Sequence, residues 1–96
     1  MPAYFISNIR VHEPEVFAQY VRQAPASIER YGGRYVVRGG AAEVHEGSWK
    51  PDRLVILEFP DADAARTWYD SEEYRAARAL RQRAAQTDVV LVEGLA

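Results

Sequence analysis

The chain has 96 residues, of which 48% are hydrophobic and 27% are charged, and its formal net charge at pH 7 is −2. This length and composition exclude a disordered chain and predict one globular domain over residues 1–96. The small net charge gives no reason to expect a nucleic acid or a membrane as a partner, and the absence of cysteine excludes disulfides and thiolate metal sites.

The first predicted elements are a strand and a long helix. The strand covers Ala3–Val11 and has apolar residues on both faces. The helix is predicted to begin at Pro14, because proline suits the first helical turn, and to end at Gly32. An apolar stripe runs along it at helical spacing. Pro25 interrupts the stripe and removes a backbone donor, which predicts a kink or a break into two segments.

Two further strands follow, joined by a polar segment. Arg34–Arg38 is rich in tyrosine and valine and predicts a strand, after which Gly39-Gly40 allows a bulge or a bend. Residues 41–50 predict the arm of a hairpin that turns near Glu46–Lys50. The third strand is predicted over Arg53–Phe59, and the proline that follows ends it.

The last third of the chain predicts two helix starts and a final strand. Asp61 is placed to cap one helix and Ser71 to cap the next, which has acidic residues in its first turn. The basic face of this second helix, which carries Arg75 and Arg78, is expected to face solvent. Val89–Val92 is apolar at four successive positions and predicts the last strand.

The order of these elements predicts the fold class. Strand, helix, strand, strand, helix, strand is typical of an α+β, ferredoxin-like βαββαβ fold with a four-stranded antiparallel sheet and helices on one face. The third and fourth strands carry apolar side chains toward both faces, although an antiparallel sheet with one wet face normally alternates. We therefore expect a homodimer in which the uncovered faces of two sheets pack together.

A set of short motifs is spread along the chain: Tyr31-Gly32-Gly33-Arg34, Val37-Arg38-Gly39-Gly40, Trp49-x-Pro51-x-Arg53, Glu58-Phe59-Pro60 and Trp68-Tyr69-x-Ser71-x-x-Tyr74. Together they resemble the domain-of-unknown-function family 1330 of the dimeric α/β-barrel superfamily. The resemblance covers essentially the whole chain and implies the ferredoxin-like protomer and the face-to-face dimer. It implies no particular reaction, because the superfamily includes cofactor-free isomerases and monooxygenases, haem-binding enzymes and binding domains. Members often have an acid near position 8, where this chain has Asn8.

Two residues are candidates for acid–base chemistry. His45 titrates near neutral pH in its ordinary state and is a candidate general acid or base, with an exposed hairpin residue as the alternative. Glu58 lies on a central strand, where a cavity-facing carboxyl would have a raised pKa and serve as a base. The alternative for Glu58 is an internal hydrogen bond or an exposed strand end. Two histidines without ligand spacing predict no metal site.

A second group of residues is predicted to bind substrate. Arg38 precedes two glycines and has the fork geometry that binds a carboxylate, unless it forms a structural salt bridge. Asn8 is a polar residue on a central strand that needs a partner. The aromatic residues Tyr35, Trp49 and Trp68 are candidates for the wall of an apolar pocket. A helical tryptophan such as Trp68 also fits the core.

Together with these polar and aromatic candidates, the superfamily resemblance implies a cytoplasmic homodimer that binds a small organic, carboxylate-bearing molecule and performs cofactor-free proton-transfer or isomerase-type chemistry. The alternative is a non-catalytic ligand-binding or assembly module. The N-terminal residues show no basic segment followed by a long apolar run, so we expect no signal peptide. Geometry separates the two hypotheses: convergence of Arg38, His45, Glu58 and Asn8 on one pocket favours an enzyme, and their dispersal favours the module.

Overall fold

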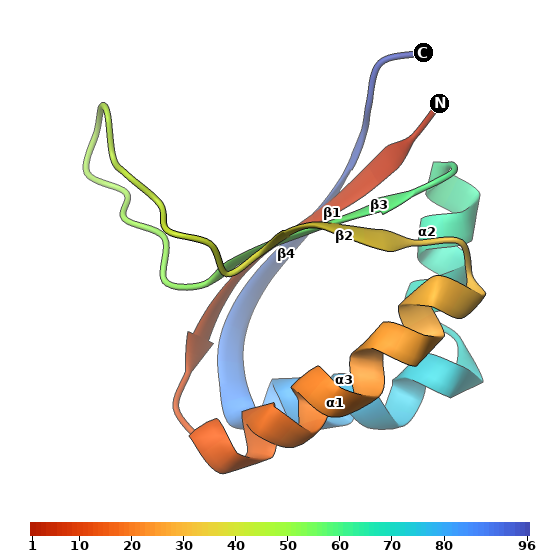
Figure 1. Ribbon diagram of the computed structural model, residues 1–96, viewed down its shortest axis with the longest axis horizontal. Helices are drawn as coiled ribbons and strands as arrows, with labels where there is room; N and C mark the ends of the chain where they lie inside the picture. The colour runs from red at the N-terminus through yellow and green to blue at the C-terminus, as the bar shows by residue number, and fades with distance from the viewer.

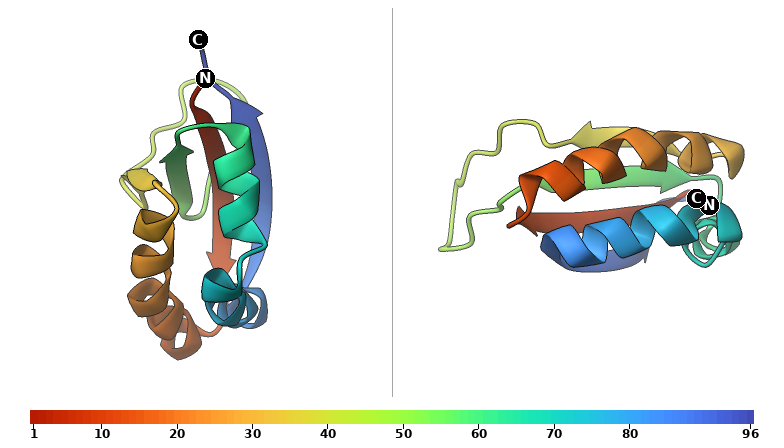
Figure 2. Two further views of the ribbon diagram at one scale, coloured as in Figure 1. Left: turned by 90° about the vertical axis from the view of Figure 1, so that its right-hand side faces the viewer. Right: turned by 90° about the horizontal axis from the view of Figure 1, so that it is seen from below.

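The computed structural model describes residues 1–96 and contains a four-stranded sheet with three helices. The elements are, in chain order, β1 (Ala3–Val11), α1 (Pro14–Arg30), β2 (Arg34–Arg38), β3 (Leu54–Phe59), α2 (Ala62–Tyr69), α3 (Glu72–Ala84) and β4 (Ala85–Glu93). The strands pair antiparallel in the order β2-β3-β1-β4, and all three helices lie on one side of the sheet (Figures 1 and 2). The predicted α+β, ferredoxin-like class is confirmed.

Both predicted N-terminal helix caps, Asp61 and Ser71, are present. A side-chain oxygen of Asp61 accepts a 2.8 Å hydrogen bond from the backbone N–H of Ala64, and the Ser71 hydroxyl accepts one of 3.1 Å from the N–H of Tyr74. Each bond satisfies a backbone donor that the first helical turn leaves free. Gly32 follows α1 with φ +79°, a left-handed conformation that glycine adopts without strain.

Of the kink or break predicted at Pro25, the break does not occur, because α1 runs continuously from Pro14 to Arg30. Packing around the proline supports the helix where one backbone hydrogen bond is missing. The Ser27 hydroxyl donates to the carbonyl of Ala24 at 2.8 Å and accepts a 3.0 Å hydrogen bond from the indole N–H of Trp68 on α2. These contacts join the turn around Pro25 to the neighbouring helix and hold both halves of α1 as one element.

The predicted hairpin arm over residues 41–50 is also wrong. Residues 39–53 contain no strand and form a long loop, in which every residue from 41 to 50 is exposed. The segment has too little apolar surface to bury, and Trp49 is 62% exposed. Gly47 adopts φ +83° and bends the chain within the predicted turn region. Figure 1 shows the loop rising beyond the end of the sheet, away from the helices.

The last strand is longer than the predicted Val89–Val92. It begins at Ala85, directly after α3, and pairs with β1 along its whole length. Polar residues such as Gln86 and Asp88 occur at its start, so the apolar run alone did not reveal it. No helix of the chain is both long and apolar enough to span a bilayer.

The core lies between the sheet and the helices and contains a cluster of aromatic rings. Phe5, Phe59, Trp68 and Tyr74 are all buried there. The rings of Trp68 and Tyr74 are closest, with centroids 4.0 Å apart. Burial of such a side chain contributes about 1.5–3 kcal/mol, so this cluster is a main source of stability for a small protein.

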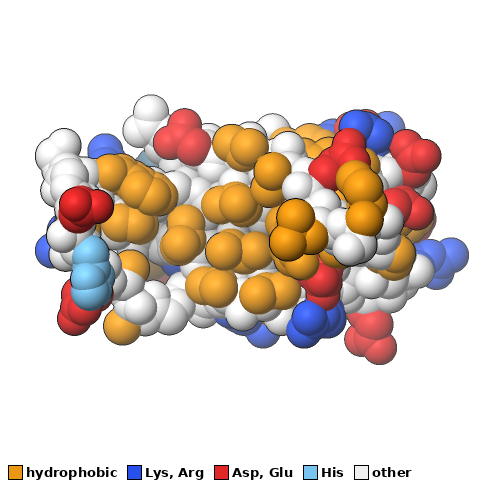
Figure 3. All heavy atoms as spheres, turned by 90° about the horizontal axis from the view of Figure 1, so that it is seen from above, with side chains coloured by type: hydrophobic (Ala, Val, Ile, Leu, Met, Phe, Trp, Pro, Cys, Tyr) orange, Lys and Arg blue, Asp and Glu red, His pale blue; other side chains and the backbone are white.

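The opposite side of the sheet, called here the outer face, carries apolar side chains that no element of the chain covers. Ile6 on β1 lies between Ile56 on β3 and Val90 on β4 in the strand register. Val90 is 58% exposed and Val92 is 44% exposed. Figure 3 looks onto this face and shows hydrophobic side chains over most of it, with charged side chains gathered toward its ends.

Candidate functional site

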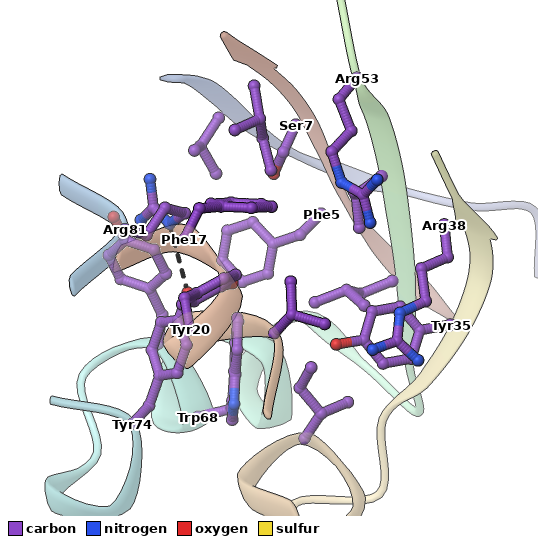
Figure 4. Close-up of a pocket in the computed structure, with 17 residues that line it drawn as sticks. Phe5, Ser7, Phe17, Tyr20, Tyr35, Arg38, Arg53, Trp68, Tyr74 and Arg81 are labelled. Atoms are coloured by element: carbon purple, nitrogen blue, oxygen red, sulfur yellow. Dashed lines mark hydrogen bonds between the residues drawn. The ribbon is translucent and has the colours of Figure 1, made fainter. Parts of the chain in front are cut away.

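A cavity lies between the inner face of the sheet and the helices, and we call it the inner cavity (Figure 4). Its volume is about 30 Å³, and the empty space reaches about 530 Å³ when the open mouth and the crevices between side chains are included. Most of its wall is aromatic or aliphatic. The lining residues are Phe5, Ser7, Ile9, Phe17, Tyr20, Val21, Ile28, Tyr35, Arg38, Arg53, Val55, Leu57, Trp68, Tyr69, Tyr74, Arg81 and Val89.

A bulge in β2 determines which of its side chains reach the inner cavity. Tyr35 pairs with Leu57 and Arg38 pairs with Val55, and the register shifts between Tyr35 and Val37. In a regular strand, residues 35 and 38 would point to opposite faces. The extra residue brings both to the cavity side, where the Arg38 guanidinium carbon lies 4.4 Å from the centroid of the Tyr35 ring. This bulge lies earlier in the strand than Gly39-Gly40, where the predicted bend is present at Gly39 with φ +71°.

Three arginines line the inner cavity, and no carboxylate does. Arg38, Arg53 and Arg81 form no salt bridge, whereas seven other arginines each pair with a carboxylate. Arg81 is only 5% exposed, and the buried Nε of Arg53 has no hydrogen-bond partner. Because buried charge is normally paired, this wall is suited to receive a negative group from outside the chain.

The hydroxyl groups of the inner cavity are neutral hydrogen-bonding groups at physiological pH. The Tyr20 and Tyr74 hydroxyl oxygens lie 2.9 Å apart and share a hydrogen bond. Burial raises the pKa of the Tyr20 hydroxyl well above its ordinary value, and burial also raises that of Tyr35. The polar lining therefore consists of guanidinium donors and un-ionised hydroxyls, with no side chain that is a strong base at neutral pH.

His45 lies outside the inner cavity, in the exposed loop between β2 and β3. Its Nε2 is 2.7 Å from a carboxylate oxygen of Glu43, and both side chains are about four-fifths exposed, at 80% and 84%. The structure thus places His45 as the exposed loop residue of the alternative interpretation. Its role as an acid or base stays a prediction that the inner cavity does not support.

Glu58 points to the outer face and does not line the inner cavity. The Tyr4 hydroxyl donates to one of its carboxylate oxygens at 3.0 Å, and Nε of Arg34 donates to the other at 2.6 Å. The hydrogen bond from Tyr4, followed by that from Arg34, lowers the pKa of the Glu58 carboxyl below its ordinary value. The shift is opposite to the one expected for a cavity-facing base.

Asn8 also lies on the outer-face side, near the far end of β1. Its Nδ2 donates to a carboxylate oxygen of Asp52 at 3.1 Å, and its Oδ1 accepts the backbone N–H of Asp52 at 2.8 Å. Hydrogen bonds from Asn8 and then from Arg10 lower the pKa of Asp52. Asn8 therefore closes the β2–β3 loop onto β1, and among the four polar candidates only Arg38 lines the inner cavity.

The aromatic candidates divide in a similar way. Tyr35 and Trp68 line the inner cavity, while Trp49 is an exposed loop residue away from it. Sequence reasoning did not select Arg53, Arg81 or Tyr74 as site residues. The position of Arg81, seven residues after Tyr74 on the buried side of α3, was a usable signal, since residues at this spacing share a helix face. Nowhere do three or more His, Asp or Glu side chains gather to hold a metal ion.

Comparisons with known proteins agree with this fold. The model of a family described as a domain of unknown function, DUF1330, matches residues 2–95. No curated protein matches the chain. A crystal structure of RPA0582 from Rhodopseudomonas palustris, a protein of unknown function, is 25% identical with a TM-score of 0.76, and the match covers 99% of this chain and 83% of that one.

Two other solved structures are similar at lower identity. A dimeric ferredoxin-like protein of unknown function from Jannaschia sp. CCS1 has a TM-score of 0.73 at 11% identity, with 98% of this chain and 100% of that chain covered. SnoaB, a cofactor-independent oxygenase from Streptomyces nogalater, has a TM-score of 0.67 at 16% identity, with 99% and 94% covered. At these identities the likeness establishes a shared fold.

Proposed function

The chain belongs to the domain-of-unknown-function family DUF1330, and from its geometry we propose that it binds a small, largely apolar organic anion, such as an aromatic carboxylate, in the inner cavity. The observation that carries this proposal is the presence of three arginines and no acid in an apolar wall. A guanidinium binds a carboxylate through charge-assisted hydrogen bonds, which are stronger in a partly dry site than in water.

The position of Arg38 supports its predicted role as the anchor of the anion. Its side chain is exposed at the edge strand, lies over the Tyr35 ring and has no carboxylate partner. Its alternative role, a structural salt bridge to Glu58 or Glu43, is not formed, because these acids pair with Arg34 and His45 instead.

Binding without catalysis is the interpretation that the inner cavity favours. Proton transfer or isomerisation needs a group that takes a proton near neutral pH. Neither His45 nor Glu58 lines the inner cavity, and burial raises the pKa values of Tyr20 and Tyr35, which do line it. We therefore favour the ligand-binding module over the isomerase-type enzyme.

We also propose that two copies associate through the outer face. The exposed Val90 and Val92 continue an apolar surface across β1 and β3, and such surface gains roughly 25 cal/mol for each square ångström removed from water. A second copy offers the same surface by symmetry. The similar fold of a protein described as dimeric and ferredoxin-like supports this assembly.

A fluorescence titration tests anion binding. The chain has two tryptophans, so the variant Trp49→Phe leaves Trp68, in the cavity wall, as the reporter. We expect benzoate to change the emission saturably, and benzamide, its neutral isostere, to have no such effect. Arg38→Met should weaken benzoate binding by about tenfold, since a hydrogen bond to a charged group contributes about 1.5–3 kcal/mol.

Arg34→Met is the matched control, because Arg34 lies on the same strand but points to the outer face toward Glu58. It should leave benzoate affinity unchanged. Equal binding of benzoate and benzamide, or no saturable binding of any aromatic acid, would reject the proposal.

A further inference from the structure

We propose that the natural ligand carries two acidic groups at opposite ends of a flat apolar body, with the inner group received by Arg81 and Tyr20. This inference rests on the proposed anion binding and adds the chemical class of the ligand. It follows from where the three guanidinium groups lie.

Arg81 defines the inner end. It is 5% exposed, and its one hydrogen bond runs from Nε to the Tyr74 hydroxyl at 3.5 Å. No carboxylate pairs with it. Arg81 lies in the last turn of α3, where the helix dipole favours positive charge, but that interaction is weak compared with the desolvation of a buried ion. A negative group on the ligand supplies the missing counter-charge.

The tyrosine pair gives the inner end a second donor. The buried Tyr74 hydroxyl oxygen accepts from Arg81, so its own proton is available for the Tyr20 oxygen, 2.9 Å away. The Tyr20 proton is then free to point into the inner cavity, which Tyr20 lines. Arg81 and Tyr20 together form a two-donor receptor for an oxyanion, and Tyr74 is a positioning residue that orients the Tyr20 hydroxyl.

Arg53 and Arg38 define the outer end. The buried Nε of Arg53 has no acceptor, and the Arg53 guanidinium carbon lies 5.5 Å from the centroid of the Phe17 ring. Figure 4 shows Arg81 beside Tyr20 on one side of the cavity, with Arg38 and Arg53 on the other side. The positive charge is therefore divided between two ends.

The wall between these ends selects the body of the ligand. The rings of Phe5 and Phe17 lie between the two groups of arginines (Figure 4). A flat unsaturated body packs against such rings better than a branched or polar one. Since the volume is about 30 Å³, entry of a ring moves side chains at the mouth, where Arg38 is exposed.

The test compares benzoate, terephthalate and phenyl phosphate in the Trp49→Phe background. Terephthalate adds a second carboxylate at the far end of the same ring, whereas phenyl phosphate carries its extra charge at one end. We expect terephthalate to bind at least about tenfold more tightly than benzoate, the effect of one added charge-assisted contact. Phenyl phosphate should not gain this preference.

Variants of Arg81 and Tyr20 then test whether these side chains receive the second carboxylate of terephthalate. Arg81→Met should remove the preference for terephthalate over benzoate, because the second carboxylate loses its charge-assisted partner. Tyr20→Phe, which keeps the ring and Arg81, should remove part of the preference. Arg75→Met is the control, because Arg75 lies on α3 but is exposed and pairs with Glu72.

Each outcome decides a different statement. Binding of benzoate and terephthalate with equal affinity overturns the two-ended ligand but leaves anion binding intact. A terephthalate preference that survives both Arg81→Met and Tyr20→Phe, or equally tight phenyl phosphate binding, overturns the inner receptor. No binding of any acid overturns the proposed function itself. Should Arg81→Met fail to fold, Tyr20→Phe still tests the inner receptor, and the comparison of benzoate with terephthalate still tests the two-ended ligand.

Discussion

The Arg38 guanidinium carbon lies 4.4 Å from the centroid of the Tyr35 ring, so both side chains face the inner cavity although they are separated by two residues on one strand. The bulge beside Val36 makes this possible, because it shifts the alternation of β2 by one position. The bulge therefore places the charged Arg38 side chain at the mouth of the inner cavity.

Insertion of an alanine between Val37 and Arg38 should shift Arg38 by one position in the strand and turn it toward the outer face. We expect benzoate affinity to fall by about tenfold, as for Arg38→Met, with the far-ultraviolet circular dichroism retained. Fluorescence titration measures the affinity. Insertion of an alanine after Ala42, in the exposed loop, lengthens the chain equally and should leave affinity unchanged. If the variant with the insertion before Arg38 binds benzoate like the wild type, the register of β2 does not position Arg38.

Gly39→Ala should destabilise the protein by about 1–2 kcal/mol. Gly39 has φ +71°, and a Cβ there would lie 2.5 Å from a terminal guanidinium nitrogen of Arg53. The substitution therefore adds backbone strain and displaces Arg53 from its place in the cavity wall. Gly40→Ala is the control, since its Cβ would meet nothing within 4 Å. Urea denaturation measures both variants, and equal stability would contradict the structural requirement for glycine at position 39.

Ser27→Ala should destabilise the protein by about 1–3 kcal/mol, the penalty for leaving a buried donor without a partner. The Ser27 hydroxyl accepts the indole N–H of Trp68, which is 2% exposed. Thr67→Ala removes a hydroxyl from an exposed position of α2 and should change stability by less than about 0.5 kcal/mol. Urea denaturation followed by tryptophan fluorescence compares them. A neutral Ser27→Ala would show that the indole finds water or another acceptor.

Val90→Glu should convert the proposed dimer into a folded monomer. Val90 is 58% exposed on the outer face, so the monomer tolerates a charge there, while a two-fold interface would bury two like charges together. Light scattering coupled to size-exclusion chromatography gives the mass. Ala76→Glu adds the same charge to an exposed position of α3 and should remain dimeric. A wild-type protein that is monomeric at micromolar concentration would rule out the dimer.

The Glu58 carboxylate should make a pH-dependent contribution to stability. Tyr4 and Arg34 hold its pKa below the unfolded value of about 4.3, so the folded state favours the ionised form. The stabilisation is fully present above that value and is lost as the pH falls through the lower folded pKa. Thermal melts should therefore show Glu58→Gln less stable than wild type at pH 7, with the difference shrinking below about pH 4.3.

Glu46→Gln is the control for this titration, because Glu46 is an exposed loop residue with no hydrogen bond to another side chain. Its melting temperature should follow that of the wild type across the pH range. A constant difference between Glu58→Gln and wild type at all pH values would show that packing, and not charge, explains the effect.

Local patterns predicted most of the architecture. Short apolar stretches located β1 and β3, and capping side chains located the starts of α2 and α3 at Asp61 and Ser71. The absence of alternation in β3 and β4 predicted an apolar outer face, and Val90 and Val92 are exposed there. These elements can be predicted from the sequence because the periodicity of strands and helices, and the hydrogen bonds of helix caps, involve residues that are close together in the chain.

Pairing across the sheet decided the site and could not be predicted in this way. Asn8 is hydrogen-bonded to Asp52 and Glu58 to Tyr4, partners 44 and 54 residues away, so both polar candidates serve the fold on the outer-face side. The bulge in β2 depends on the register of β2 with β3, and the position of Arg81 beside Tyr20 depends on how α3 packs against α1. A sequence specifies which residues are apolar, charged or able to cap, but which charges remain without a partner depends on contacts between distant segments, and only the tertiary structure determines these.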